Sequence, residues 1–428
     1  MRHRGAQPRT LIGLDGPITF SRVRFQCGKT GRMVVPLDEA LDLPDGEVTP
    51  SLAQRALRLG TKLSFPELQE ELLEQHDVRL TDSTLDTLAT KVGGIAEADR
   101  QSQTKAVAAL PRGVAREQKV KERRPAPKVL YVSCDGIMYR TRYREKDPEN
   151  PKKNRLIYQE MKVGSVFWQD DDERWHKQVL SGRDDPESFG LSLWILAVEC
   201  GMLNCQQVVF ISDGGSWCGT VAETYFKHAT RILDWYHLSE YVWDAARALH
   251  PGDEDARELW VKASLGHLHD TGGAGLIAHL EQCLATLGDG GAQHMDPLMN
   301  YLRPRLAITD YPSYRAKGYI TGSGMMESTC KQVVERRLCG SGMQWGETGA
   351  VAMAALVSKK LTRCGRNSGP PVPCTGRRRR PSSKAELACL FATENWMHPE
   401  CRGRELFTCN GAVVCYNKSV GIFQPKPH

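Results

Sequence analysis

Two apolar runs, each ending in an aspartate followed by glycine, constrain the fold of this chain more than any other feature. Residues 128–135 and 207–213 are rich in β-branched and aromatic side chains and end at Asp135 and Asp213. Short apolar runs of this kind are typical of buried strands. The surrounding strand and helix patterns cover residues 155–168, 175–181, 230–233, 188–201 and 217–226. An α/β domain with a mixed sheet is therefore predicted.

The sequence before the first strand divides into three parts. Residues 1–48 are rich in Gly, Arg and Pro, and we expect them to be irregular. Residues 49–94 have a helical pattern, in which Ser64 and Glu67 have the spacing of a capping box. A second helix is predicted from about residue 83, with Leu85, Leu88 and Val92 facing inward. Two short helices joined by a tight turn resemble a helix-turn-helix, so a small helical DNA-binding domain is predicted. A helical hairpin that binds nothing is the alternative.

Positive charge is concentrated between this helical region and the first strand. The net charge of the 428 residues is +6, and residues 105–128 contain eight Lys or Arg against two Glu. Basic segments of this kind suit DNA, although a solvated linker is the alternative interpretation. We predict a basic linker over residues 95–128, or alternatively a long solvated helix that ends at Pro125 and Pro127. The predicted DNA contacts are Lys119, Lys121, Arg123 and Arg124, together with Arg336 and Arg337 farther along the chain.

The composition also excludes some classes of protein. No stretch approaches eighteen consecutive apolar residues, so no membrane partner is expected. The first ten residues are polar and basic and lack the apolar core of a signal peptide. The predicted location is therefore the cytoplasm, in association with the nucleoid.

Three carboxylates carry the predicted chemistry. Asp135 and Asp213 end two strands, and Glu327 lies in the first turn of a helix for which Ser323 is the natural N-cap. Lys331 is one turn farther on the same face, positioned to contact a phosphate. Hard divalent cations prefer carboxylate oxygens, and two ions can activate an attacking oxygen and stabilise a leaving one. Each acid also has a structural interpretation, as a strand-ending turn or a helix-capping residue.

Four motifs in order make the interpretation specific. They are Ser212-Asp213-Gly214-Gly215-Ser216-Trp217, Ile232-Leu233-Asp234-Trp235-Tyr236-His237, Gly322-Ser323-Gly324-Met325-Met326-Glu327-Ser328 and Ser341-Gly342-Met343-Gln344-Trp345. This series resembles the ISKra-type insertion-sequence transposases, a DDE group related to the Mutator-like elements. The resemblance runs from about residue 36 to residue 361. It implies a ribonuclease H-like sheet with Asp135, Asp213 and Glu327 as the metal-binding catalytic triad.

The resemblance also implies supporting residues and a domain plan. Asp234 and His237 match an acid followed three residues later by His, and they are expected to support the triad. A structural Asp that caps the next helix is the alternative. The predicted catalytic domain begins with residues 129–236, is interrupted by a helical insertion at 237–318, and ends with the helices of 319–361.

The two ends of the chain depart from the family pattern. Relatives begin with paired cysteines resembling a zinc ribbon, whereas Cys27 stands alone here, so residues 1–48 are interpreted as an eroded ribbon. Residues 362–428 are expected to be a basic tail of low order. The tail residues His398, Cys401, Cys409 and Cys415 are spaced too loosely for a zinc knuckle, and no zinc is expected.

The predicted activity is cleavage at transposon ends followed by joining to target DNA, with two Mg²⁺ or Mn²⁺ ions. Water attacks the phosphodiester at the element's end, and the freed 3′-hydroxyl then attacks the target. The expected partners are the terminal repeats, the target DNA and further copies of the chain assembled on DNA. Two alternatives remain: a stand-alone ribonuclease H-like nuclease, and a catalytically inactive DNA-binding derivative.

Overall fold

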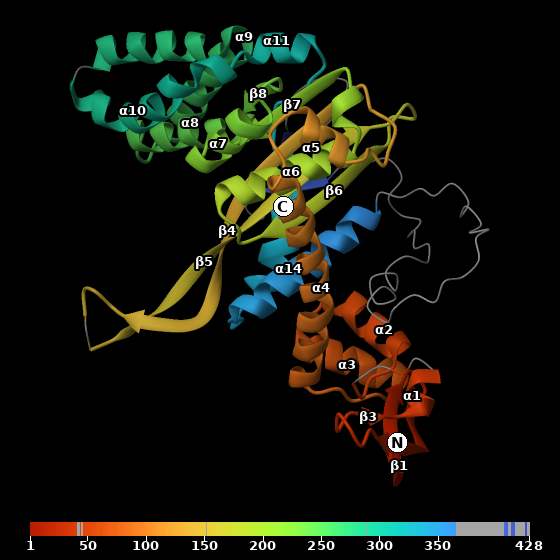
Figure 1. Ribbon diagram of the computed structural model, residues 1–428. Helices are drawn as coiled ribbons and strands as arrows, with labels where there is room; N and C mark the ends of the chain where they lie inside the picture. The colour runs from red at the N-terminus through yellow and green to blue at the C-terminus, as the bar shows by residue number, and fades with distance from the viewer. Residues whose placement is uncertain are drawn as a thin grey trace.

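The computed structural model describes most of the chain (Figure 1). The described residues are 1–40, 43, 46–150, 152–287, 289–364, 406–409, 412–415 and 424–425. No helix among them is long and apolar enough to cross a membrane.

A mixed five-stranded sheet forms the centre of the molecule, with the strand order β6-β5-β4-β7-β8. Its strands are β4 (Val129–Lys146), β5 (Asn154–Gln169), β6 (Trp175–Gly182), β7 (Gln207–Ser212) and β8 (Thr230–Leu233). The pairs β4–β5 and β5–β6 are antiparallel, whereas β4–β7 and β7–β8 are parallel. The predicted α/β class and mixed sheet are confirmed.

Both faces of the sheet are covered by helices, because its strands carry apolar side chains in both directions. On one face, Leu130 and Val132 pack against α6 (Pro186–Glu199) and α7 (Ser216–Tyr225). On the other face, Tyr131 packs with the helical insertion. Continuous apolar runs of this kind are what a strand buried on both faces requires.

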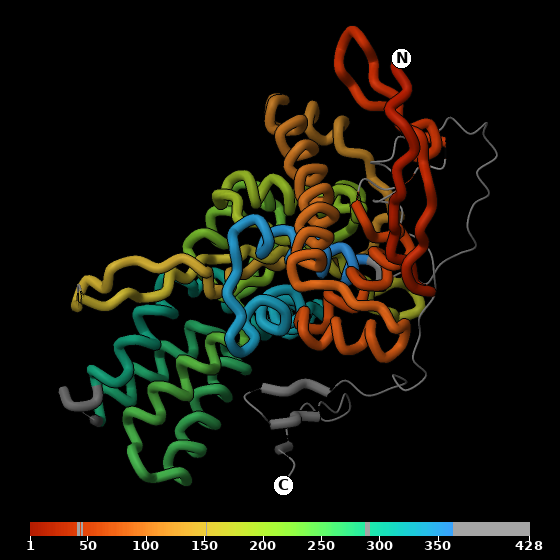
Figure 2. Tube along the Cα trace, turned by 90° about the horizontal axis from the view of Figure 1, so that it is seen from below, coloured from red at the N-terminus to blue at the C-terminus, as the bar shows by residue number. Residues whose placement is uncertain are grey.

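β4 is longer than predicted. The apolar run ends at Asp135, and the strand was predicted to end there as well. In the structure, β4 continues to Lys146. β4 pairs with β7 only as far as Ser133. The part of β4 beyond Ser133 has β5 as its one neighbouring strand. This two-stranded hairpin projects from the body in both views (Figures 1 and 2). Residues 142–146 are all exposed, so no run of apolar residues marks this part of the strand.

The expectation of an irregular segment over residues 1–48 is wrong for its first half. β1 (Arg2–Gly13) and β2 (Gly16–Gln26) form an antiparallel hairpin, to which β3 (Met33–Val34) adds a short strand. Asp15-Gly16 is a typical hairpin turn signal, and Gly16 has a φ of +99°. β2 carries Ile18, Phe20, Val23 and Phe25, but the phase of the alternation changes between Phe20 and Val23, so the pattern that usually marks a strand is broken.

The helices that follow begin as predicted but extend farther. The elements are α1 (Pro36–Ala40), α2 (Pro50–Gly60), α3 (Phe65–His76), α4 (Asp82–Ala108) and α5 (Val114–Lys119). The capping box of Ser64 and Glu67 is confirmed. Of the two predictions for residues 95–128, the structure has a helix rather than a linker over the first part, because α4 continues to Ala108, but this part of the helix is packed rather than fully solvated. Thr104 and Val107 are buried there, and the hydroxyl of Thr104 lies 2.8 Å from that of Ser192 on α6.

The helical insertion and the last helices cover the second face of the sheet. The insertion contains α8 (Trp235–Leu249), α9 (Glu254–Leu287), α10 (Asp289–Leu302), η2 (Arg303–Ile308) and α11 (Tyr311–Ala316). They gather at one end of the sheet, away from the N-terminal hairpin (Figure 1). The remaining elements are η1 (Met202–Asn204), α12 (Gly324–Cys330), the π-helical turn η3 (Lys331–Glu335), α13 (Arg336–Leu338) and α14 (Glu347–Cys364).

The predicted low-order tail falls mainly outside the described residues. Three short strands are described there: β9 (Leu406–Cys409), β10 (Ala412–Cys415) and β11 (Gln424–Pro425). The side chains of the tail cysteines and of His398, which bear on a zinc site, also lie outside what the structure describes.

Candidate functional site

Asp135 and Asp213 lie next to each other at one level of the sheet. The parallel pairing of β4 with β7 ends at Ser133 opposite Ile211, and each aspartate comes two residues later. Alternation along a strand places Asp135 on the same face as Tyr131, and Asp213 on the same face as Ile211. Tyr131 and Ile211 belong to one core cluster. The two aspartates, which we call the carboxylate pair, therefore point toward the face that the insertion and α12 cover.

The environment of the carboxylate pair disfavours negative charge on Asp135. Burial raises the pKa of Asp135 to about 6, and the charge of Asp213 adds to the rise. The backbone N–H of Gly136 donates to Asp135 at 2.6 Å and opposes the rise, as do Cys330 and His237. Perturbed carboxyl groups of this kind occur preferentially at functional sites. The site holds more negative charge than its own side chains neutralise.

The loop that carries Asp213 is fixed by the helical insertion. The backbone N–H of Gly215 donates to Asp213 at 2.9 Å, and Arg305 donates to the carbonyl of Gly214 at 2.8 Å. The hydroxyl of Tyr301 donates to the carbonyl of Asp213. Gly214 has a φ of +79°, and a Cβ there would meet the Arg305 side chain at 2.4 Å, so only glycine fits. The sequence contains no local signal for Tyr301 and Arg305, since both lie about 90 residues away.

Glu327 lies on α12, the helix that crosses over β4. The thiol of Cys330, one turn after Glu327, donates to Asp135 at 3.7 Å, which brings this helix to the carboxylate pair. Glu327 itself is exposed, and partial burial followed by the charge of Asp234 raises its pKa. Lys331 is exposed one turn away and favours the charged form of Glu327. The π-helical turn begins at Lys331, and such turns are frequent at functional sites.

Asp234 is the structural link between β8, α8 and α12. It is 4% exposed and is the N-cap of α8, accepting from the backbone N–H groups of Tyr236 and His237. It also accepts from the backbone N–H of Ser323 at 2.9 Å and from its hydroxyl at 2.5 Å. Ser323 has the predicted N-cap position of α12, but its hydroxyl does not cap the helix because Asp234 binds it. Asp234 thereby positions the start of the helix that carries Glu327.

His237 lies beside the carboxylate pair on α8. Its ring packs edge-to-face against Tyr301, with the ring centroids 5.7 Å apart. Its Nδ1 is 3.5 Å from a carboxylate oxygen of Glu240. It is half-buried and near enough to Asp135 to lower the pKa of that carboxyl, against the larger effect of burial.

The six predicted DNA contacts differ in their surroundings. Lys119, Lys121 and Arg336 are exposed. Arg123 is paired with Glu199 at 2.9 Å, and Arg124 lies over the ring of Trp168 at 5.4 Å.

Arg337 does not fit the predicted role, because it is 2% exposed. Its guanidinium lies over the rings of Phe65 and Trp345, and its Nε donates to the carbonyl of Gly60 at 2.6 Å. Burial lowers its pKa to about 10. Arg337 therefore joins the helical N-terminal region to the domain of the five-stranded sheet, and the sequence alone could not distinguish it from the exposed Arg336.

The carboxylate pair offers oxygen ligands of the type that Mg²⁺ and Mn²⁺ prefer. A cation would also stabilise the ionised form of Asp135, which burial and, to a smaller extent, the charge of Asp213 disfavour. Among the described residues, no three acidic, His or Cys side chains are placed closely enough to hold a metal ion together. The pair thus fits a divalent cation in its chemistry, whereas Glu327 is not gathered with it in this arrangement.

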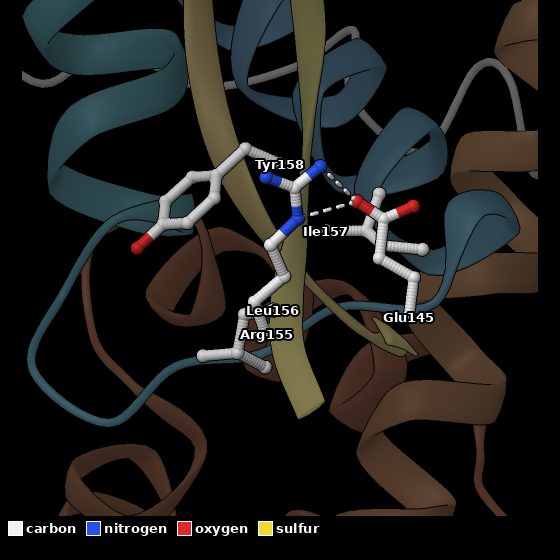
Figure 3. Close-up of a pocket in the computed structure, with 5 residues that line it drawn as sticks. All are labelled: Glu145, Arg155, Leu156, Ile157 and Tyr158. Atoms are coloured by element: carbon white, nitrogen blue, oxygen red, sulfur yellow. Dashed lines mark hydrogen bonds and ion pairs between the residues drawn. The ribbon is translucent and has the colours of Figure 1, made fainter. Parts of the chain in front are cut away.

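A surface hollow lies away from the carboxylate pair, on the projecting hairpin (Figure 3). It is lined by Glu145, Arg155, Leu156, Ile157 and Tyr158. Arg155 turns its guanidinium toward Glu145, and the two form an ion pair at 2.7 Å. The hollow is shallow and contains none of the predicted site residues.

Comparisons with known proteins identify a family but no activity. No curated protein matches the chain. Among solved structures, the chain is similar to the "Drosophila P element transposase strand transfer complex", with 10% identity and a TM-score of 0.26, over 76% of this chain and 85% of that chain. That similarity is too weak to support a conclusion about fold or activity. The model of one uncharacterised protein family matches residues 2–369. The chain belongs to this family, UPF0236.

Proposed function

We propose that this chain is a DDE-type DNA transposase with a ribonuclease H-like catalytic domain. The strand order β6-β5-β4-β7-β8, with three antiparallel strands followed by two parallel ones, supports that fold. The observation that carries the proposal is the carboxylate pair, which lies just past the last paired residues of the parallel strands β4 and β7, with the helix of Glu327 crossing beside it. The ISKra-type assignment rests on the sequence motifs.

The carboxylate pair would hold the divalent cations, and Glu327 would complete the ligand set. When bound, two such cations supply charge stabilisation for the attacking and leaving oxygens of a phosphodiester. Asp135 must be ionised to act as a ligand, which its raised pKa permits at neutral pH. Asp234 holds the start of α12, so it acts as a positioning residue rather than a ligand.

Two side chains beside the site would bind the phosphates. Lys331 is exposed one turn after Glu327 and would contact a phosphate of the substrate. His237 lies on α8, with its ring against that of Tyr301, and would donate a hydrogen bond to DNA. Tyr301 and Arg305 donate hydrogen bonds to the backbone carbonyls of Asp213 and Gly214, and we call these contacts the clamp. The clamp would keep the Asp213 loop in place while the substrate is exchanged.

A cleavage assay tests the proposal. The full chain is incubated with Mg²⁺ or Mn²⁺ and a plasmid carrying the DNA that flanks its gene. We expect cleavage at the element's ends, loss of that cleavage in Asp135→Asn and Glu327→Gln, and normal cleavage in Glu335→Gln. Glu335→Gln is the matched control because it makes the same change at an exposed site close to Glu327.

The products separate the proposal from its alternatives. Joining of the cut ends to a second plasmid supports a transposase, whereas cleavage without joining indicates a nuclease. A wild-type chain that retains the flanking DNA but never cuts it would indicate an inactive derivative. Full cleavage by Asp135→Asn would contradict the assignment of the site.

A further inference from the structure

The projecting hairpin has no role in the site described above. We define the hairpin arm as residues 140–158, which comprise the outer parts of β4 and β5 and the turn between them. The arm projects from the body in two views (Figures 1 and 2). A two-stranded hairpin without a core is marginally stable in water. An arm of this length therefore needs an explanation.

The arm concentrates the positive charge of the chain. It contains seven Lys or Arg and three Asp or Glu, a net charge of +4, while the whole chain has a net charge of +6. Among the described residues of the arm, the one ion pair is that of Arg155 with Glu145. Arg142, Arg144, Lys146, Lys152 and Lys153 are exposed. Their charge is thus available to a polyanion.

The base of the arm is fixed to the body. The backbone N–H of Arg142 donates to the carbonyl of Trp345 at 3.0 Å, and that of Trp345 donates to Arg140 at 3.1 Å. The hydroxyl of Thr141, which is fully buried, donates to the carbonyl of Ile157 at 2.7 Å. The register of β4 with β5 shifts between Arg140 and Arg144, and such irregularities bend a strand. The arm is therefore aimed by these contacts at its base.

The arm and the carboxylate pair are linked by strand β4, which contains Asp135 and the first strand of the arm. Asp135 and the arm belong to the same strand, and the arm begins five residues beyond Asp135, roughly 17 Å at the rise of an extended strand. Arg144 and Lys146 are alternate residues and share one face, with the uncharged Leu156 and Asn154 opposite them. A two-stranded β-ribbon fits the major groove of duplex DNA, and Lys and Arg bind its phosphates.

We propose that the hairpin arm binds duplex DNA alongside the segment held at the carboxylate pair, through the phosphates of its backbone. The inference rests on the proposed function, since it assigns a contact to the same substrate. The alternative is that these charges have only a protective role and prevent the exposed strand edges from pairing with other chains. In that case the arm would add nothing to DNA affinity.

Salt-dependent binding tests the inference. The affinity of the full chain for a fluorescent random-sequence duplex is measured by anisotropy, without divalent cations, between about 0.05 and 0.2 M salt. The test variant combines Arg142→Gln, Arg144→Gln and Lys146→Gln. The control combines Lys227→Gln, Lys262→Gln and Lys317→Gln, which remove the same charge at exposed sites in and near the helical insertion.

We expect the plot of log affinity against log salt to become shallower by about 2 to 3 in the test variant, since each lost phosphate contact lowers the slope by about one. The control should keep the wild-type slope. An unchanged slope in the test variant would overturn the inference. So would a loss of self-association in the test variant with unchanged DNA binding, because the arm would then bind a second copy.

The two proposals fail separately. Binding without divalent cations does not depend on cleavage, so a chain that never cuts DNA can still show the expected slope. Conversely, cleavage that requires Asp135 together with an unchanged slope would retain the proposed function and reject the role of the arm.

Discussion

The two halves of β4 differ in almost every physical property, although they form one continuous strand. Before Asp135, the side chains of Leu130 and Val132 are fully buried and the strand has neighbours on both sides. Beyond it, residues 142–146 are exposed and one neighbouring strand remains. Desolvation raises the pKa of a carboxyl in the first half, while solvation keeps the cations of the second half free to bind. Burial, rather than secondary structure, thus separates the part of the strand that carries the proposed metal site from the part that carries the proposed DNA contacts.

The largest expected effect comes from comparing a buried arginine with the exposed arginines of the arm. Arg337→Ala should lower the free energy of unfolding by about 3 to 4 kcal/mol, because it leaves a cavity between Phe65 and Trp345. Arg144→Ala should change it by less than about 0.5 kcal/mol, since the side chain is exposed. Urea unfolding of both variants measures the difference. Equal stabilities would show that Arg337 is not the structural link described above.

A second comparison concerns the charge on Asp135. Its pKa in the folded chain is about 6, above the ordinary value of 3.8, so ionisation opposes folding by about 3 kcal/mol once the pH exceeds 6. Asp135→Asn should therefore stabilise the chain by about 2 kcal/mol at pH 7.5 without divalent cations. The gain should diminish as the pH falls from 6 toward 3.8 and disappear below about pH 3, where the carboxyl is protonated in both states.

Thermal or urea unfolding at several pH values measures this gain. Asp171→Asn is the matched control, because the side chain of Asp171 is 93% exposed. A gain of the same size in Asp171→Asn, or one that persists undiminished at pH 3, would contradict a penalty caused by burial of Asp135.

The smallest expected effect lies on the arm. Glu145 and Arg155 form an ion pair at 2.7 Å, with side chains 47% and 54% exposed. Exposed pairs contribute about 0 to 1 kcal/mol, so Glu145→Gln should change stability by less than about 0.5 kcal/mol. The same substitution removes a negative charge from the arm and should strengthen DNA binding slightly. A marked loss of stability would show that the arm depends on this pair for its shape.

Burial also determined which parts of the fold could be predicted. β7 and β8 coincide with apolar runs of the sequence, and their bounds match the patterns at residues 207–213 and 230–233 to within one residue. The capping box at Ser64 and Glu67 was likewise readable, because it is a local hydrogen-bond pattern. The arm and the N-terminal hairpin were missed because their exposed strands carry no unbroken apolar alternation.

Long-range contacts limited the prediction of the site. Asp135 and Asp213 follow two apolar runs that pair as parallel strands, and the sequence contains those two runs. The clamp formed by Tyr301 and Arg305 on the Asp213 loop spans about 90 residues, and no local pattern encodes it. Arg336 and Arg337 are adjacent and chemically identical, yet tertiary packing buries one and exposes the other.

Cation binding tests the central claim most directly, because the carboxylate pair is assigned as the ligand of a divalent metal. Calorimetric titration of Mn²⁺ into the full chain at pH 7.5 measures it without a DNA substrate. We expect saturable binding by the wild type, loss of binding when Asp135→Asn and Asp213→Asn are combined, and unchanged binding by Glu335→Gln. Binding that is equally strong in the double variant would contradict the claim that Asp135 and Asp213 form the metal site.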